Sequence, residues 1–134
     1  MSRIMLIDDH SAMGMIFRTM LGAMGQAPAD FEFCQDVDDA VTRIENNPPY
    51  DVIFLDNIVP PAFEFRGSLA MMDALDKTTR VVLLSGEIPN DFGSETIDAR
   101  IAACMEKDSL SARSLHELLT VSYTHLRAHE TRRY

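Results

Sequence analysis

Polar side chains follow four short apolar stretches of this chain, and their types suit phosphoryl or metal chemistry. Carboxylates can hold a divalent cation or act as nucleophiles towards phosphorus. A hydroxyl group can donate a hydrogen bond to an anion, and an amine adds a positive charge. These residues are Asp8 and Asp9 after the first stretch, Asp56 at the end of the second, Ser85 at the end of the third and Lys107 after the fourth.

Asp56 ends the clearest of these stretches, Val52–Asp56. Four consecutive apolar residues lie between Pro48-Pro49 and Pro60-Pro61, which is typical of a short strand buried on both faces. Such a strand delivers its last side chain to the carboxyl edge of a sheet, where open α/β folds bind ligands. An acid there is either a structural residue or a reactive group, and this pattern favours a reactive group.

The rest of the chain predicts strands that alternate with helices. Short apolar runs indicate strands, and apolar residues at helical spacing indicate helices. Further strands are expected at Arg3–Ile7, Phe31–Cys34, Arg80–Gly86 and Ile101–Met105. Apolar residues mark helices over Met13–Met24, Val37–Ile44, Leu69–Leu75 and Leu115–Leu119, with a short further helix at 91–99.

Residues at the ends of these helices predict where they begin and end. Small polar side chains accept hydrogen bonds from the first free N–H groups of a helix, and glycine often follows its last turn. The expected caps are Ser11 for the first helix, Asp36 or Asp38 for the second and Ser109 or Ser111 for the last, and Gly25 is expected to end the first helix.

Five β-α repeats predict a parallel sheet covered by helices on both faces, with right-handed crossovers. We therefore expect a single α/β domain over residues 1–122: a (βα)5 flavodoxin-like three-layer fold with a five-stranded parallel sheet in order 2-1-3-4-5. In such a sheet the polar strand ends lie at one edge. Three carboxylates there repel one another and need a cation, and Mg²⁺ suits such oxygen ligands.

A phosphoryl group on Asp56 is the candidate for the charge that Ser85 and Lys107 would bind. The ordered set of strand-end residues resembles bacterial response-regulator receiver domains of two-component systems, over residues 2–121. The resemblance implies that Asp56 is the phosphoacceptor and that Ser85 and Lys107 bond the phosphoryl oxygens. It also implies a Mg²⁺ site formed by Asp8, Asp9, Asp56 and the backbone carbonyl of Ile58.

The resemblance implies a signalling role with protein partners. The phosphoryl group would come from a histidine kinase or a phosphotransfer protein. The output would be a downstream protein partner or a homodimer, through the face of the fourth helix, the fifth strand and the fifth helix. The resemblance therefore implies that the chain is not an enzyme, and that it performs at most self-catalysed phosphoryl transfer and autodephosphorylation.

Several positions depart from the receiver pattern. Cys104 stands where receivers usually carry an aromatic switch residue, and Asp108 stands where many carry a proline. Gly67 comes later after Asp56 than usual, so the loop from Pro60 to Gly67 looks like an insertion. These departures keep open a pseudo-receiver that binds partners without phosphorylation. A hydrolase is disfavoured because Ile58 stands where such phosphatases carry a second acid, and a flavin carrier because no phosphate loop follows the first strand.

Three further residues leave two interpretations each. His10 is either a metal ligand or a solvent-facing residue at the rim of the site. Phe63 and Phe65 form either an exposed patch that binds a partner or a lid over the third helix.

Composition limits the function classes. A chain of 134 residues with net charge −9 has the size of one domain and argues against direct nucleic-acid binding. The sequence contains no apolar run of the ~18 residues that a membrane span needs and no signal-peptide pattern, so a cytoplasmic protein is expected. Cys34 and Cys104 are expected to be buried free thiols. The basic tail 123–134 is either non-native sequence or a helix extension.

Overall fold

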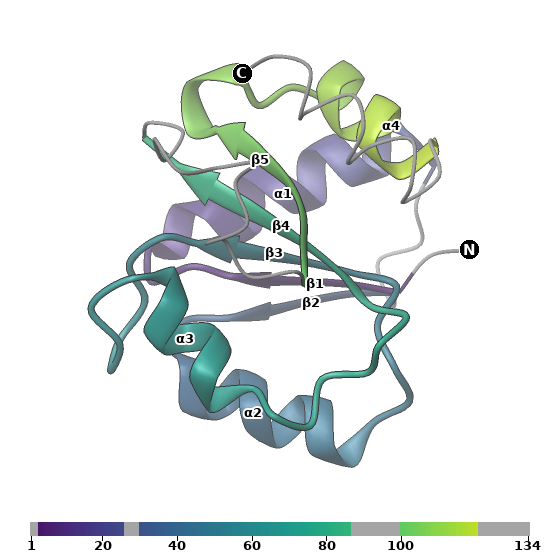
Figure 1. Cartoon of the computed structure of the whole chain (residues 1–134). Coiled ribbons are helices and arrows are strands. Elements are labelled where there is room, and N and C mark those ends of the chain that lie inside the picture. The colour runs from purple at the N-terminus through teal and green to yellow at the C-terminus, as the bar shows by residue number, and fades with distance from the viewer. Residues whose placement is uncertain (1–2, 26–29, 87–99, 121–134) are drawn as a thin grey trace.

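The computed structural model describes residues 3–25, 30–86 and 100–120. Within these ranges one five-stranded sheet has the order β2-β1-β3-β4-β5, and neighbouring strands are parallel (Figure 1). The predicted sheet, including its order, is confirmed. The strands are β1 (Ile4–Ile7), β2 (Phe31–Cys34), β3 (Val52–Asp56), β4 (Arg80–Ser85) and β5 (Ile101–Glu106).

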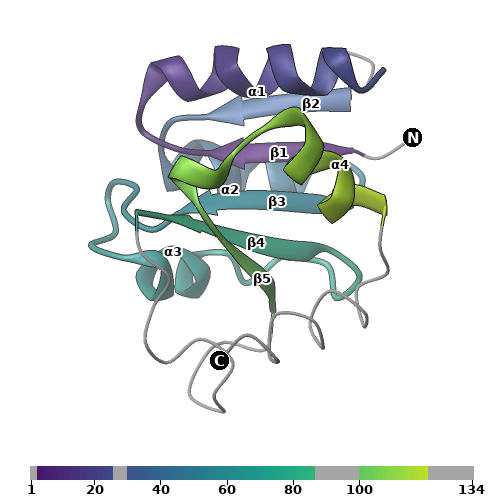
Figure 2. The same cartoon turned by 90° about the horizontal axis from the view of Figure 1, so that it is seen from above.

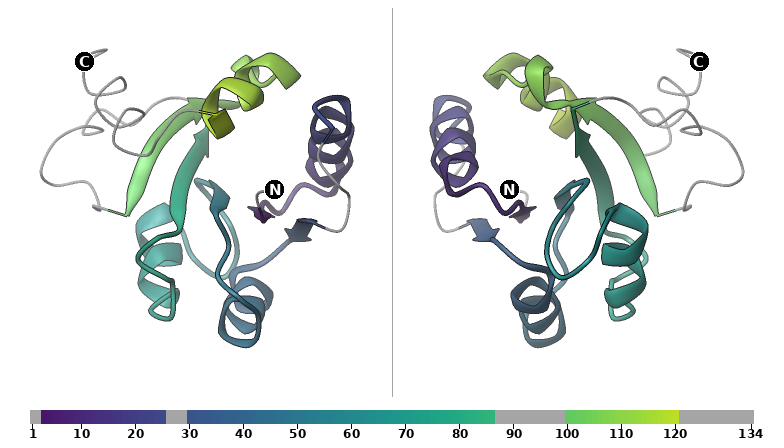
Figure 3. Two further views of the ribbon diagram at one scale, coloured as in Figure 1. Left: turned by 90° about the vertical axis from the view of Figure 1, so that its right-hand side faces the viewer. Right: turned by 90° about the vertical axis from the view of Figure 1, so that its left-hand side faces the viewer.

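Helices cover both faces of the sheet, which makes the predicted three layers. Figure 3 shows α1 and α4 on one side of the sheet and α2 and α3 on the other. The predicted helix at 91–99 and the predicted tail at 123–134 lie outside the described residues. No helix of the described residues is long and apolar enough to cross a membrane. The helices are α1 (Ser11–Ala23), α2 (Val37–Asn46), α3 (Phe65–Met71) and α4 (Ala112–Thr120).

The sheet divides the core into two clusters, because side chains alternate along each strand. In β3, Ile53 and Leu55 pack with α2 and α3, whereas Val52 and Phe54 pack with α1 and α4. All five residues of β3 are buried, as expected for the central strand of a doubly covered parallel sheet. The buried strands thereby hold the polar residues at their ends in fixed positions.

The start of α1 differs from the prediction. Ser11 is the first helical residue and not the cap, which is His10 and makes no side-chain capping bond. The side chain of Asp8 instead accepts a hydrogen bond from the His10 N–H at 2.9 Å, so the acidic turn itself joins strand to helix. Gly25 ends the helix as predicted, with a φ of 85° that glycine adopts without strain.

Two open capping alternatives are resolved by hydrogen bonds. Asp36 caps α2, because its carboxylate accepts the Asp39 N–H at 2.7 Å. Ser111 caps α4, because its hydroxyl accepts the Ser114 N–H at 3.0 Å.

The third helix begins earlier and ends earlier than predicted. The apolar pattern placed it over Leu69–Leu75, but α3 spans Phe65–Met71. Burial explains the difference: Phe65 is 1% exposed and anchors the first turn of α3 in the core, which shortens the loop after β3. Phe63 is 93% exposed, so the two phenylalanines form neither one common patch nor one common lid.

Candidate functional site

Strand register brings the predicted site residues to one edge of the sheet. Ile7 is paired with Leu55, so Asp8, which directly follows β1, lies next to Asp56, the last residue of β3. Ser85 ends β4 opposite Glu106 of β5, so Lys107 follows directly beside it. Figure 2 shows the arrowheads of β1, β2 and β3 pointing to the same side. The expectation that the four polar strand ends converge is confirmed.

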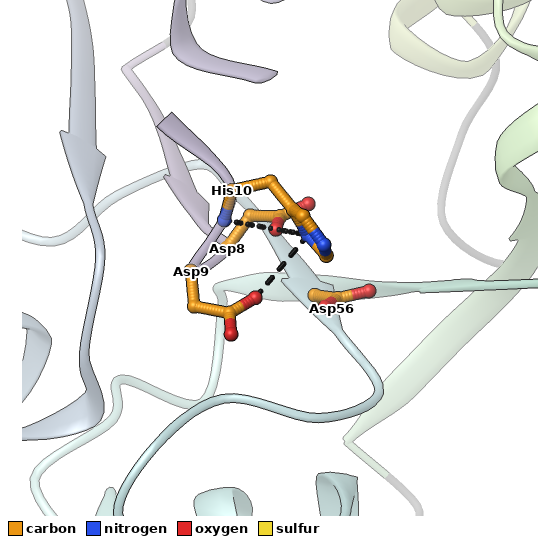
Figure 4. A group of neighbouring side chains, drawn as sticks. All are labelled: Asp8, Asp9, His10 and Asp56. Atoms are coloured by element: carbon orange, nitrogen blue, oxygen red, sulfur yellow. Dashed lines mark hydrogen bonds and ion pairs between the residues drawn. The ribbon is translucent and has the colours of Figure 1, made fainter. Parts of the chain in front are cut away.

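Three carboxylates and one imidazole form a compact cluster at this edge (Figure 4). Asp8, Asp9, His10 and Asp56 each offer one ligand atom, and these atoms all lie within 4.8 Å of one another. The Asp8 side chain is fully buried and Asp56 is 6% exposed, whereas Asp9 is exposed. The cluster thus has a buried floor and an open side.

Lys107 joins two of these carboxylates. Its Nζ lies 2.8 Å from Asp56 Oδ1 and 3.1 Å from Asp8 Oδ2. Asp8 is buried, and its Oδ2 is paired with the Lys107 amine. The two buried carboxylates, Asp8 and Asp56, therefore share one positively charged partner.

The pKa values of the two central groups follow from this packing. Burial raises the pKa of Asp56, the charge of Asp8 raises it further, and Lys107 opposes both effects. Burial lowers the pKa of Lys107, but its contacts with Asp56 and Asp8 outweigh burial and leave its pKa raised. The amine is therefore charged at neutral pH. For Asp56, the effect of Lys107 on the pKa does not fully offset the effects of burial and of Asp8.

An open cleft of about 400 Å³ lies over the cluster. Ile58 is 58% exposed in the loop after β3, and Ser85 is 5% exposed at the end of β4. All the predicted site residues except the buried Asp8 line this cleft. The lining residues are Asp9, His10, Asp56, Asn57, Ile58, Ser85, Gly86 and Lys107.

Two further residues shape the site. His10 Nδ1 lies 2.9 Å from Asp8 Oδ1 and 3.2 Å from Asp9 Oδ1, and its contact with Asp8 raises the pKa of the imidazole. The sequence signal for His10 was its place after the acidic pair. Asn57, which the sequence reasoning did not single out, holds the turn after β3: its side-chain oxygen accepts the Phe65 N–H at 3.4 Å.

The donor set fits a hard divalent cation. Carboxylate oxygens from three residues are the ligands that Mg²⁺ takes, and the open side of the cleft leaves room for its waters. Lys107 contacts Asp8 and Asp56 and supplies one positive charge against three carboxylates, so among these described residues the acids are in excess.

Solved structures with the same fold include receiver domains. A receiver-domain protein from Methanospirillum hungatei has a TM-score of 0.75 and 18% identity, over 96% of this chain and 98% of that chain. The receiver domain of a Francisella response regulator has a TM-score of 0.73 and 20% identity, over 93% and 98%. The receiver domain of a sensor histidine kinase from Pseudomonas aeruginosa, with magnesium coordinated in its active site cleft, has a TM-score of 0.65 and 17% identity, over 88% and 93%.

No family model and no curated protein sequence matches the chain. At these identities the structural similarity establishes the fold, which is that of the response-regulator receiver domain. The acidic cluster lies at the carboxyl edge of that fold, where α/β sheets of this class bind their ligands.

Proposed function

We propose that Asp56 accepts a phosphoryl group from a phosphohistidine of a histidine kinase or phosphotransfer protein, in a Mg²⁺-dependent reaction of bacterial two-component signalling in the cytoplasm. One observation carries this proposal. A nearly buried carboxylate contacts a lysine amine at 2.8 Å and lies in a cluster of acids that opens to a cleft. This arrangement supports both a nucleophile and the neutralisation of an incoming phosphoryl group.

The transfer exchanges one bond to phosphorus for another. A carboxylate oxygen of Asp56 forms the new O–P bond, and the P–N bond of the phosphohistidine breaks. The departing imidazole keeps the bonding electron pair and takes up a proton. Positioning and charge neutralisation supply most of the catalysis in such reactions, so the protein mainly has to hold its groups in place.

The surrounding residues have separate tasks in this proposal. Asp8, Asp9, Asp56 and the backbone carbonyl of Ile58 would hold the Mg²⁺, which when bound would supply positive charge against the phosphoryl oxygens. The acyl phosphate then attracts the two remaining groups: Lys107 pairs with a phosphoryl oxygen, and the Ser85 hydroxyl donates a hydrogen bond to another.

The phosphoryl group would shift a two-state equilibrium on a partner-binding face. We place that face over the predicted helix at 91–99, β5 and α4, where a downstream protein or a second copy would bind. Its support is the position of Lys107, which directly follows β5 and precedes α4.

Beryllofluoride tests the phosphoacceptor directly, because it mimics an acyl phosphate on a carboxylate. With Mg²⁺, we expect a bound ¹⁹F signal and changes in the amide spectra around Asp56 and Ser85. Asp56→Asn, which keeps the shape of the side chain, should give neither. An absent response in the unmodified chain, or an equal response in the Asp56→Asn variant, contradicts the proposal.

A pseudo-receiver is the second candidate, and Cys104 favours it. This side chain, on β5, is 4% exposed and belongs to the core cluster that packs against α2 and α3. A small buried thiol cannot swing between core and surface as a large aromatic residue does. This candidate predicts that Asp56→Asn leaves partner binding unchanged in a pull-down, whereas the phosphoacceptor proposal predicts that beryllofluoride changes it.

A further inference from the structure

The loop between β3 and α3 carries two large apolar side chains that face solvent. Phe63 is 93% exposed and Ile58 is 58% exposed, whereas Val59 and Phe65 in the same segment are buried. Figure 2 shows this loop extending past the strand ends at the carboxyl edge of the sheet. Burial of an aromatic ring is strongly favourable, so exposed apolar side chains that lie close together can mark a surface that a partner covers.

Backbone hydrogen bonds hold this loop in a defined shape. The Pro60 carbonyl oxygen accepts the Val37 N–H of α2 at 2.9 Å. The Val59 carbonyl oxygen accepts the Ala62 N–H at 3.0 Å, which closes a turn just before Phe63. The exposed ring therefore stands on an ordered backbone. A partner that buries it has little loop entropy to overcome, which favours binding.

The same loop borders the cleft over Asp56. Ile58 lines this cleft, and Phe63 follows five residues later. A β-turn brings its two ends within about 7 Å, so the Cα atoms of Ile58 and Phe63 lie within about 15 Å of each other. A typical interface of about 800 Å² per partner has a radius of about 16 Å if it is round. A protein that binds over the cleft therefore reaches Phe63.

The proposed phosphoryl transfer requires a protein at this place. The P–N bond of the phosphohistidine has to reach the Asp56 carboxylate in the cleft, so the body of the donor lies over the rim that Ile58 forms. Aromatic residues are enriched at the cores of protein interfaces. We propose that Phe63 anchors the histidine-bearing donor by inserting into an apolar pocket beside its phosphohistidine. This inference rests on the proposed function and identifies how the donor is recognised.

The position of the loop separates this contact from the proposed output face. The bond from Val37 to Pro60 ties the loop to α2. Figure 3 shows α2 on the opposite side of the sheet from α4, which belongs to the output face. A donor held at Phe63 thus leaves α4 accessible to a downstream partner.

Two phosphoryl donors separate recognition from chemistry, each used with the full chain and Mg²⁺. Phosphoramidate has a P–N bond without a protein surface: the bond to phosphorus forms at Asp56, the P–N bond breaks and ammonia leaves. Phe63→Ala should react with phosphoramidate at the rate of the unmodified chain. The protein donor is the fastest of a purified set of ³²P-labelled histidine phosphotransfer proteins. With it we expect kcat/KM to fall at least about tenfold in Phe63→Ala, mainly through a higher KM.

Two further variants serve as controls. Lys77→Ala truncates an exposed side chain before β4, at the amino edge of the sheet, and should keep both rates. Phe63→Leu keeps an apolar side chain at the loop and should lose less activity with the protein donor than Phe63→Ala. An unchanged kcat/KM of Phe63→Ala with the protein donor, or an equal loss with phosphoramidate, overturns the inference.

The remaining outcomes separate this inference from the proposed function. If phosphoramidate modifies Asp56 but no protein donor of the set transfers to the unmodified chain, the phosphoacceptor stands and the inference fails. If neither phosphoramidate nor beryllofluoride acts at Asp56, both fail together. Analytical ultracentrifugation tests the competing occupant: a dimer of the unmodified chain that Phe63→Ala dissociates assigns the ring to a second copy and also overturns the inference.

Discussion

Gly14 lies where α1 packs against the Phe33 ring of β2, and an alanine there should destabilise the protein. A Cβ at Gly14 would lie 2.5, 2.8 and 3.0 Å from three ring carbons of Phe33 on β2. Real Cβ atoms do not come this close, so either the ring or the helix has to move. Because α1 begins directly after the acidic turn, a shift of this helix would also displace Asp9 and His10.

Two opposing effects determine the size of the change. In a helix alanine is favoured over glycine by about 0.8–1.0 kcal/mol. Overpacking of a filled site typically costs about 1–3 kcal/mol. The Phe33 ring is only half-buried and can yield in part, so we expect Gly14→Ala to lower the free energy of unfolding by roughly 1 kcal/mol. Urea titration followed by circular dichroism measures it.

Gly22 provides the matched control in the same helix. A Cβ there meets no atom within 4 Å, so Gly22→Ala should raise the free energy of unfolding by about 0.5–1 kcal/mol. A double-mutant cycle of Gly14→Ala with Phe33→Ala should show a coupling of about 1 kcal/mol, because the smaller side chain removes the clash. If Gly14→Ala is as stable as Gly22→Ala, the close packing of α1 on β2 is refuted.

Four further predictions concern single side chains. Burial raises the pKa of Cys34 to about 12, so its thiol should react with iodoacetamide at pH 8 only after unfolding; peptide mass mapping checks this. Because that pKa is raised in the folded state, Cys34 should also lower the stability of the protein as the pH rises above about 9, where the thiol ionises first in the unfolded state. Thermal unfolding of the unmodified chain and of Cys34→Ala at several pH values measures this effect. Identical pH profiles of the two proteins would contradict it. Asp36→Ala removes the cap that accepts the Asp39 N–H and should cost about 1 kcal/mol in urea unfolding; no loss would show that water replaces the cap. Phe65→Ala should cost about 3–5 kcal/mol and Phe63→Ala less than about 0.5 kcal/mol; equal losses would refute the burial difference between them.

The sheet could be predicted from the sequence because its strands carry a strong local signal. Val52–Asp56 is a continuous apolar run, and such runs in alternation with helical patterns leave few topologies for a compact fold. The convergence of Asp8, Asp56, Ser85 and Lys107 followed from the parallel sheet alone. No knowledge of individual side-chain contacts was needed for this part of the site.

The errors arose where tertiary contacts outweigh local pattern. Nothing near Phe65 in sequence distinguishes it from Phe63, and only the space beneath α3 determines which of the two rings is buried. Ser11 is a good cap by type, but the Asp8 carboxylate, held by the end of β1, already occupies that turn. The sequence placed His10 beside the acidic pair, but its contacts with Asp8 and Asp9 could not be predicted because they depend on the orientation of the ring.

The charges of the cluster bear on the order of events at the proposed site. When ionised, Asp8, Asp9 and Asp56 carry three negative charges, and Lys107 compensates one of them. One divalent cation would neutralise the remaining two. A phosphoryl group brings further negative charge into this cleft, so it should be accepted only once the cation is bound. Because linkage is reciprocal, an acyl-phosphate mimic should tighten cation binding by the same factor by which the cation tightens binding of the mimic.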